Sequence, residues 1–106
     1  MKNILVLNDT ISSKNFGCQL VSHSLRKTLN EVYPDSNVTY VGVNNKEFRP
    51  ELVYDLVIVN GEGSFGHHYQ MPGGFANNGP IMRWYMDRGV DVHLVNLSIQ
   101  CNLDML

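Results

Sequence analysis

The fold is decided by the stretch Asp55-Leu56-Val57-Ile58-Val59-Asn60-Gly61-Glu62-Gly63-Ser64. Its first half, Leu56 to Val59, is a continuous apolar run rich in β-branched residues. Such a run is typical of a strand covered on both faces of a parallel sheet. From Asn60 onward the residues are polar or glycine, and ligands of open α/β sheets bind just beyond the carboxyl ends of strands. The stretch predicts a buried strand that leads into a ligand-binding loop. A plain turn after a strand would also fit the two glycines alone.

Working outward, strand-like runs alternate with helical patterns. We expect strands over residues 4–7, 38–43, 55–60 and 92–97. A helix of about four turns is expected from near Asn15 to Pro34. A second helix is expected to have Pro80 at its first position and to end at Gly89, after a long loop over residues 61–79. This order predicts an α/β fold, a Rossmann-like parallel sheet of about four strands with flanking helices.

The first helix has an amphipathic pattern. Apolar residues recur near the helical period, and this stripe is expected to face the sheet. Ser22 and Arg26 fall on the other faces of the predicted helix. The residues of the expected stripe are Phe16, Leu20, Leu25, Leu29 and Val32, with Ser24 beside Leu25.

Composition excludes several classes of protein. The chain has 106 residues and a net charge of −2, and its eight Lys and Arg residues are scattered, so no nucleic-acid partner is expected. No apolar run reaches the ~20 residues of a membrane helix, and four apolar residues near the N-terminus are too few for a signal peptide. We expect no membrane insertion and a cytoplasmic location.

Residues 1–106 read as one domain that is the N-terminal half of something longer. A second copy or a missing C-terminal half would then cover apolar surface near the last strand.

Polar residues at two strand ends are the candidate substrate-binding groups. Asn8, Asp9, Asn15 and Gly17 follow the first strand, where either a ligand loop or a simple helix cap would fit. Neither a Gly-x-Gly-x-x-Gly motif nor a phosphate-binding P-loop is present, which argues against a classical NAD or ATP enzyme, and no cofactor is expected. The second group follows the third strand and comprises Asn60, Gly61, Gly63 and Ser64.

Three residues of the long loop are the candidate catalytic groups. Glu62 is a carboxylate among glycines, and His67 and His68 have side chains that titrate near neutral pH, so they can serve as acid or base. Glu62 also fits a carboxylate bonded to its own loop backbone. The histidines show no metal-ligand spacing, and no metal is predicted.

These residues resemble the polysaccharide pyruvyl transferase family. Residues 55–65, followed by His67 and His68, are similar to the Asp-x-Val-Ile-x-Asn-Gly-Glu-Gly-Ser/Thr hallmark of that family and its nearby histidine. Residues 8–10, 15–19 and 92–100 resemble its opening loop, its first helix and its next strand. Many members carry Asp where Cys18 stands, while a subset has Cys.

The resemblance implies an activity, and it implies that the two substrates bind to different halves of the protein. The family has two Rossmann-like halves, similar to GT-B glycosyltransferases, and transfers a pyruvate unit from phosphoenolpyruvate to sugar hydroxyls of cell-surface polysaccharides. The residues that bind phosphoenolpyruvate belong to its C-terminal half. This chain would supply the acceptor-sugar side, would be inactive alone, and would use Asn60, Glu62 and Ser64 to hold the sugar.

Two other functions fit the same residues. The chain could be a non-catalytic module that binds a sugar or a sugar nucleotide. It could also be the acceptor half of a GT-B-like glycosyltransferase, which needs a second half with the donor site.

Overall fold

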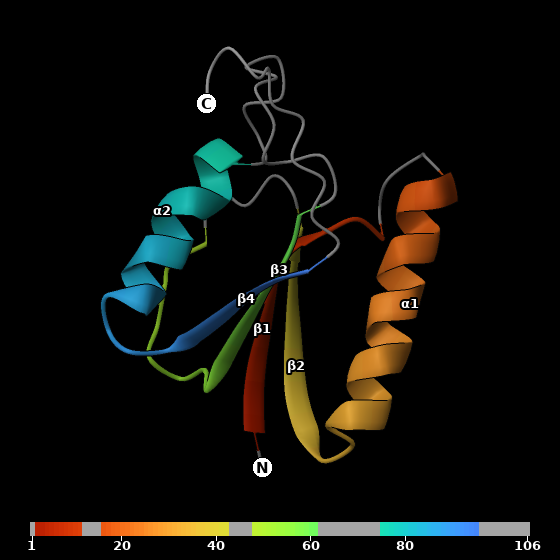
Figure 1. The fold of residues 1–106 in the computed structure, drawn as a ribbon, viewed down its shortest axis with the longest axis horizontal. Helices are drawn as coiled ribbons and strands as arrows, with labels where there is room; N and C mark the ends of the chain where they lie inside the picture. Colours follow the sequence, from red (N-terminus) through yellow and green to blue (C-terminus); the bar gives the residue numbers. More distant parts are fainter. Residues whose placement is uncertain (1, 12–15, 43–47, 62–74, 96–106) are drawn as a thin grey trace.

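A four-stranded parallel sheet forms the centre of the molecule (Figure 1). The computed structural model describes residues 2–11, 16–42, 48–61 and 75–95, and for residues 75–78 the backbone only. Its elements are β1 (Lys2–Asp9), α1 (Phe16–Val32), β2 (Ser36–Gly42), β3 (Leu56–Asn60), α2 (Phe75–Met86) and β4 (Asp91–Val95). The strand order is β2-β1-β3-β4. The predicted α/β fold with a parallel sheet is confirmed.

The two central strands are apolar because both of their faces are covered. In β1, Leu5 and Leu7 pack with Val57 and Val59 of β3 on the face that receives Ile81 and Tyr85 of α2. Alternate residues of the same strands turn to the other face and pack with Leu29 of α1; they are Ile4, Val6, Leu56 and Ile58. α1 and α2 therefore lie on opposite faces of the sheet.

The direction of each crossover explains this arrangement. From β1 the chain passes through α1 to β2 on one side, and from β3 it passes through α2 to β4 on the other. Right-handed crossovers that move in opposite directions place their helices on opposite faces. The connection from β2 to β3 crosses the sheet in the same direction as the connection from β3 through α2 to β4. Its residues Phe48 and Tyr54 pack on the same face as α2.

Helix α1 is rotated relative to its apolar stripe. Of the expected stripe, Leu29 is buried and Leu25 is partly buried, whereas Phe16, Leu20 and Val32 are exposed by 72%, 50% and 59%. The prediction that the whole stripe faces the sheet is wrong. Ser22 is instead buried because its hydroxyl group hydrogen-bonds to β1, as described below.

Helix α2 begins earlier than predicted. It starts at Phe75, so Pro80 lies inside the helix and not at its first position. The ring of Pro80 removes one N–H donor, which costs the helix one hydrogen bond and does not end it. The helix ends at Met86, two residues before the predicted last residue, and the predicted stop Gly89 closes the turn that follows: it has φ +77°, and the N–H of Val90 donates to the Tyr85 carbonyl at 3.1 Å. This is the left-handed glycine end of a Schellman motif.

The remaining boundaries shift by a few residues. β1 and β2 extend beyond the predicted cores, and β3 begins one residue later than predicted, at Leu56. β4 begins one residue earlier, at Asp91. Residues 43 and 96–97, which the prediction also placed in strands, lie outside the described part of the chain.

Candidate functional site

The sheet has one topological switch point, between β1 and β3. The chain leaves β1 toward one edge of the sheet and leaves β3 toward the other. Connections that diverge in this way open a crevice at the carboxyl ends of the two strands, where open α/β sheets bind ligands. In this molecule that position corresponds to the last residues of β1 and to Asn60 and Gly61, and it is called the crevice below.

Two asparagines join the two strands at this crevice. The Asn8 side-chain Nδ2 donates to the Asn60 carbonyl at 2.6 Å, and the Asn60 Nδ2 donates to the Asn8 carbonyl at 3.3 Å. Both residues are 1% exposed. Each asparagine side chain thus donates a hydrogen bond to a main-chain carbonyl of the other strand, where the ladder of strand hydrogen bonds ends.

Asn8 also changes the direction of β1. It has φ 62°, in the left-handed region that Asn tolerates better than most residues. The register between β1 and β2 slips here, since Leu7 pairs with Val41 and Asp9 with the next residue, Gly42. In a regular strand, side chains two residues apart share a face, so Asp9 would share the α2 face with Leu7. The extra residue turns Asp9 to the α1 face.

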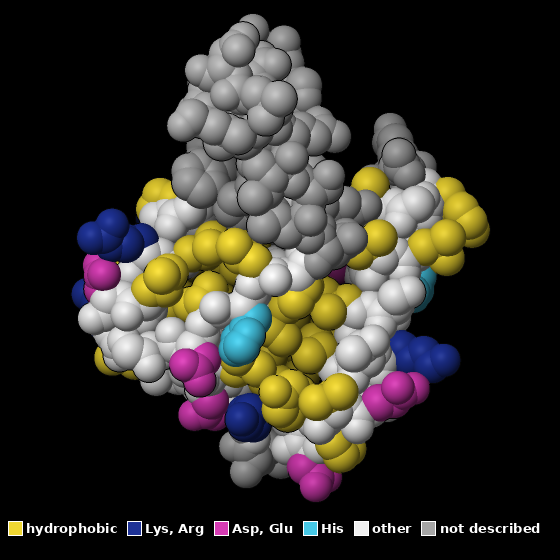
Figure 2. Space-filling model, viewed as in Figure 1, with side chains coloured by type: hydrophobic (Ala, Val, Ile, Leu, Met, Phe, Trp, Pro, Cys, Tyr) yellow, Lys and Arg dark blue, Asp and Glu magenta, His cyan; other side chains and the backbone are white. Residues whose placement is uncertain are grey.

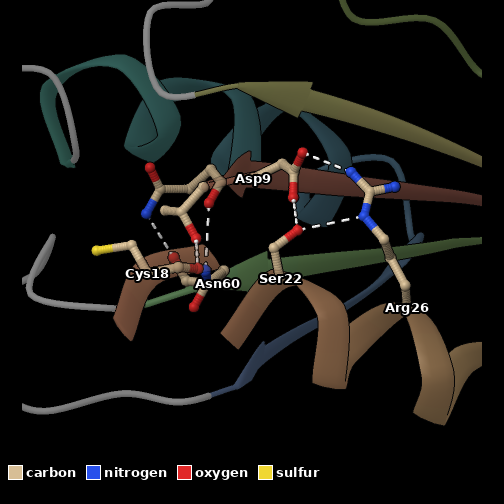
Figure 3. Close-up of polar contacts among 7 residues, drawn as sticks. Asp9, Cys18, Ser22, Arg26 and Asn60 are labelled. Atoms are coloured by element: carbon tan, nitrogen blue, oxygen red, sulfur yellow. Dashed lines mark hydrogen bonds and ion pairs between the residues drawn. The ribbon is translucent and has the colours of Figure 1, made fainter. Parts of the chain in front are cut away.

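Asp9 is held by two side chains of α1. Ser22 donates its hydroxyl hydrogen to Asp9 Oδ1 at 2.5 Å, and Arg26 Nη2 lies 2.7 Å from Oδ2. Arg26 Nε also donates to Ser22 Oγ at 3.2 Å. Both carboxylate oxygens therefore accept charge-assisted hydrogen bonds, and Figure 3 shows all three side chains converging.

Tyr40 of β2 completes this cluster. The Arg26 guanidinium carbon lies 3.7 Å from the centroid of the Tyr40 ring, within the range of a cation–π contact. Burial raises the pKa of Tyr40, an effect that the positive charge of Arg26 partly opposes. The cluster connects β1, α1 and β2, so it fixes α1 against the sheet beside the crevice.

The start of α1 is tied to the same end of β1. Thr10 Oγ1 donates to the Cys18 carbonyl at 2.7 Å. Gly17 is exposed in the first turn of the helix. This bond brings the first turn of α1, and with it Gly17, to the carboxyl end of β1.

The predicted site residues divide into three groups. Asn8, Asn60 and Gly61 are brought together at the crevice, with Asp9 adjacent but turned into the contact with α1. Gly17 lies at the first turn of α1. Predicted residues outside the described part of the chain are Asn15, Glu62, Gly63, Ser64, His67 and His68.

Sequence reasoning missed Ser22 and Arg26, which it assigned to the faces away from the sheet. The available signal was their i, i+4 spacing, which places both on one side of a helix that follows a buried acidic residue. Within the described ranges, no group of three or more His, Cys, Asp or Glu residues could hold a metal ion. None of the described helices is both long enough and apolar enough to cross a membrane.

The fold and the site define an open, parallel α/β protein in which a pair of asparagines joins the two strands at the switch point. Compared with protein-family models, with curated proteins and with solved structures, the chain has no match.

Proposed function

We propose that this chain provides the acceptor-sugar side of a polysaccharide pyruvyl transferase-like protein. The supporting observation is the Asn8–Asn60 pair. It joins, at the switch point, the ends of two segments that carry the family resemblance, one after β1 and one after β3. These segments are far apart in the sequence, and a shared ligand would explain why both resemble the family.

The chemistry of the crevice suits a sugar. An asparagine side chain carries two hydrogen-bond donors and an acceptor oxygen, which match hydroxyl groups that both donate and accept. Gly61 is buried and donates its N–H to the Val95 carbonyl at 2.8 Å. This bond holds the first residue after β3 against β4.

In the proposed reaction, an acid protonates the methylene carbon of phosphoenolpyruvate, and a sugar hydroxyl loses its proton to a base and bonds to the neighbouring enol carbon. A second hydroxyl of the same sugar then bonds to that carbon, the C–O bond to phosphate breaks, and phosphate leaves with the second proton. Glu62 is our candidate base, with His67 or His68 assisting proton transfer. Asn60 and Ser64 would orient the acceptor. The partner half would bind phosphoenolpyruvate, so this chain alone should not turn over.

A non-catalytic module that binds a sugar or a sugar nucleotide is the second candidate, and the hydrogen bonding of the Asp9 carboxylate favours it. Asp9 is the one carboxylate that the described residues place beside the crevice, and both of its oxygens are engaged by Ser22 and Arg26. An acceptor half of a GT-B-like glycosyltransferase would share the same sugar-binding crevice, and a nucleotide-sugar titration would identify it.

The test is a titration followed by backbone amide chemical shifts. The purified chain receives phosphoenolpyruvate in one series and methyl glycosides of galactose, mannose and glucose in another. We expect shifts over residues 60–68 with a glycoside and none with phosphoenolpyruvate. Asn60→Ala should abolish the shifts, whereas Asn30→Ala, on an exposed position of α1, should leave them unchanged.

Two results would overturn the proposal. Shifts with phosphoenolpyruvate alone would move the donor site into this chain. The absence of shifts with every glycoside would remove the acceptor role.

A further inference from the structure

Asn60 and Gly61 form one of the two Asn-Gly pairs in the sequence, and the other is Asn78-Gly79. An Asn-Gly pair is chemically labile in water. Because glycine has no side chain, its backbone nitrogen readily reaches the side-chain carbonyl carbon of the asparagine before it. That attack expels the amide nitrogen of the asparagine as ammonia, which is deamidation.

The peptide unit between Asn60 and Gly61 is held from both sides. Its carbonyl oxygen accepts a hydrogen bond from Asn8 Nδ2 at 2.6 Å, and its N–H donates to the Val95 carbonyl at 2.8 Å. The Asn60 side chain is held as well, since its Nδ2 donates to the Asn8 carbonyl at 3.3 Å. The Gly61 nitrogen therefore cannot turn toward the Asn60 side chain while the ends of β1 and β4 are in place.

The surroundings of Asn60 also oppose the reaction. Asn60 is 1% exposed and Gly61 is buried, so water has little access to either residue. Leu20, Leu25 and Val95 line the same hollow as Asn60, and Figure 2 shows hydrophobic side chains gathered on this side of the molecule. A surrounding of low polarity disfavours the anionic nitrogen that must form before the attack.

We propose that Asn60 is a deamidation site that the ends of β1 and β4 keep closed, and that it reacts only when these ends separate from β3. After separation, the Gly61 nitrogen loses its proton to solvent and bonds to the side-chain carbonyl carbon of Asn60. The bond from this carbon to Nδ2 breaks, and ammonia leaves after taking up a proton. Water then opens the succinimide ring and leaves aspartate or isoaspartate at position 60. The inference does not depend on the sugar-binding role proposed above.

The product cannot restore the closed arrangement. A carboxylate has no hydrogen to donate to the Asn8 carbonyl, and a buried carboxylate beside that carbonyl is unfavourable. Isoaspartate also adds one atom to the main chain, which displaces Gly61 from its partner Val95. A single reaction at Asn60 therefore changes the crevice irreversibly.

Deamidation rates of the folded and the unfolded chain test the proposal. The full chain is incubated at mildly alkaline pH in buffer and in guanidinium chloride, and each asparagine is followed by peptide mass spectrometry and by enzymatic methylation of isoaspartate. Asn78 in denaturant is the reference for an accessible Asn-Gly pair. We expect Asn60 to react in buffer at least about a hundredfold more slowly than in denaturant, because the strand ends must open first. Equal rates for Asn60 in the two solutions would overturn the proposal.

A pair of matched variants tests the role of the strand ends. Asn8→Gly removes the side-chain bond to the Asn60 carbonyl and permits the backbone conformation at φ 62°. We expect it to raise the rate of Asn60 in buffer by at least about fivefold. The control is Asn37→Gly, whose exposed side chain bonds to Asn3 at the other end of the sheet and should leave the rate unchanged.

Leu29→Ala shows what a less stable fold does by itself, because it opens a cavity in the core and leaves the bonds of Asn60 in place. We expect it to raise the rate of Asn60 less than Asn8→Gly does. An equal or larger rise in Leu29→Ala would assign the protection to the whole fold and overturn the proposal. So would an Asn8→Gly variant that reacts at the parent rate.

Discussion

Asn8 determines the local geometry of the crevice at the scale of single residues. Its left-handed backbone introduces the register slip that turns Asp9 toward α1, and its side chain bonds to β3. The same residue therefore positions both the Asn60 pair and the Asp9 cluster. A residue in a sparsely populated conformation at a switch point is a reasonable marker of a functional site.

Substitutions at Asn8 should separate the effect of its left-handed backbone on stability from the effect of its side-chain hydrogen bond. Asn8→Gly and Asn8→Ala both lose the hydrogen bond to Asn60, but only glycine adopts φ 62° without strain. We expect Asn8→Ala to be less stable than Asn8→Gly by about 1 kcal/mol. Urea unfolding of the two variants measures the difference. Equal stabilities would show that the left-handed conformation at Asn8 is not required.

The ion pair of Arg26 should matter far more than the ion pair of Arg83. Arg26→Ala leaves the buried Asp9 carboxylate with Ser22 as its remaining partner in the cluster, and it also removes the contact with Tyr40. We expect it to lower the free energy of unfolding by about 2 kcal/mol. The matched control is Arg83→Ala, whose pair with Asp87 is mostly exposed and should contribute less than about 0.5 kcal/mol. Similar losses in both variants would contradict the assigned role of the Asp9 cluster.

At the level of the helices, a small set of contacts holds each helix on the sheet. For α1 these are the hydrogen bonds of Ser22 and Arg26 to Asp9 and the burial of Leu29. α2 is anchored by Tyr85, which is fully buried, packs edge-on against the rings of Tyr54 and Trp84, and accepts the Glu51 N–H at 3.1 Å. Tyr85 therefore ties α2 to the segment before β3 as well as to the sheet.

Stability at high pH should depend on Tyr85. Burial raises the pKa of its phenol, which the hydrogen bond from the Glu51 backbone partly opposes. In the unfolded chain a tyrosine ionises near pH 10, so the unfolded state loses its proton first as the pH rises. The contribution of the neutral phenol is present below about pH 10 and is lost as the pH rises through the higher folded-state pKa. Tyr85→Phe should flatten this decline in urea unfolding measured between about pH 9 and 11; an unchanged slope would assign the decline to other groups.

At the scale of the whole molecule, the strand order places β1 and β3 in the centre and β2 and β4 at the edges. All five residues of β3 are buried, whereas β4 has no buried residue. The centre therefore holds most of the apolar contacts, and the two edges each lack a neighbour among the described strands.

Amide hydrogen exchange should follow this order. Slow exchange requires opening of the most stable unit, which normally contains the best-packed strands. We expect the slowest amides in β1 and β3, with β2 and β4 exchanging faster. Amides of β4 as slow as those of β3 would indicate a further neighbour along its outer edge.

Much of the fold could be predicted because its signals are local. The unbroken apolar run in β3, the alternation of strands with helices and the glycine at the end of α2 each depend on a few neighbouring residues. The start of α2 was placed wrongly because the preference of proline for a first helical position is weaker than the gain from an additional helical turn. At the candidate site, Asn8 and Asn60 were identified from their positions at strand ends, but their mutual hydrogen bonds require the parallel pairing of β1 with β3.

The class of fold follows from patterns along the chain, because a strand buried on both faces must be apolar and a crossover needs a helix of matching length. The rotation of α1 and the role of Asp9 depend on contacts between elements that are distant in the sequence. One left-handed residue in β1 turns the Asp9 carboxylate to the α1 face, and a buried carboxylate must be hydrogen-bonded. Ser22 and Arg26 supply those bonds, and they face the sheet together with Leu25 and Leu29. The i, i+4 spacing of Ser22 and Arg26 places both on one side of α1, but Asp9 in another element decides that this side faces the sheet.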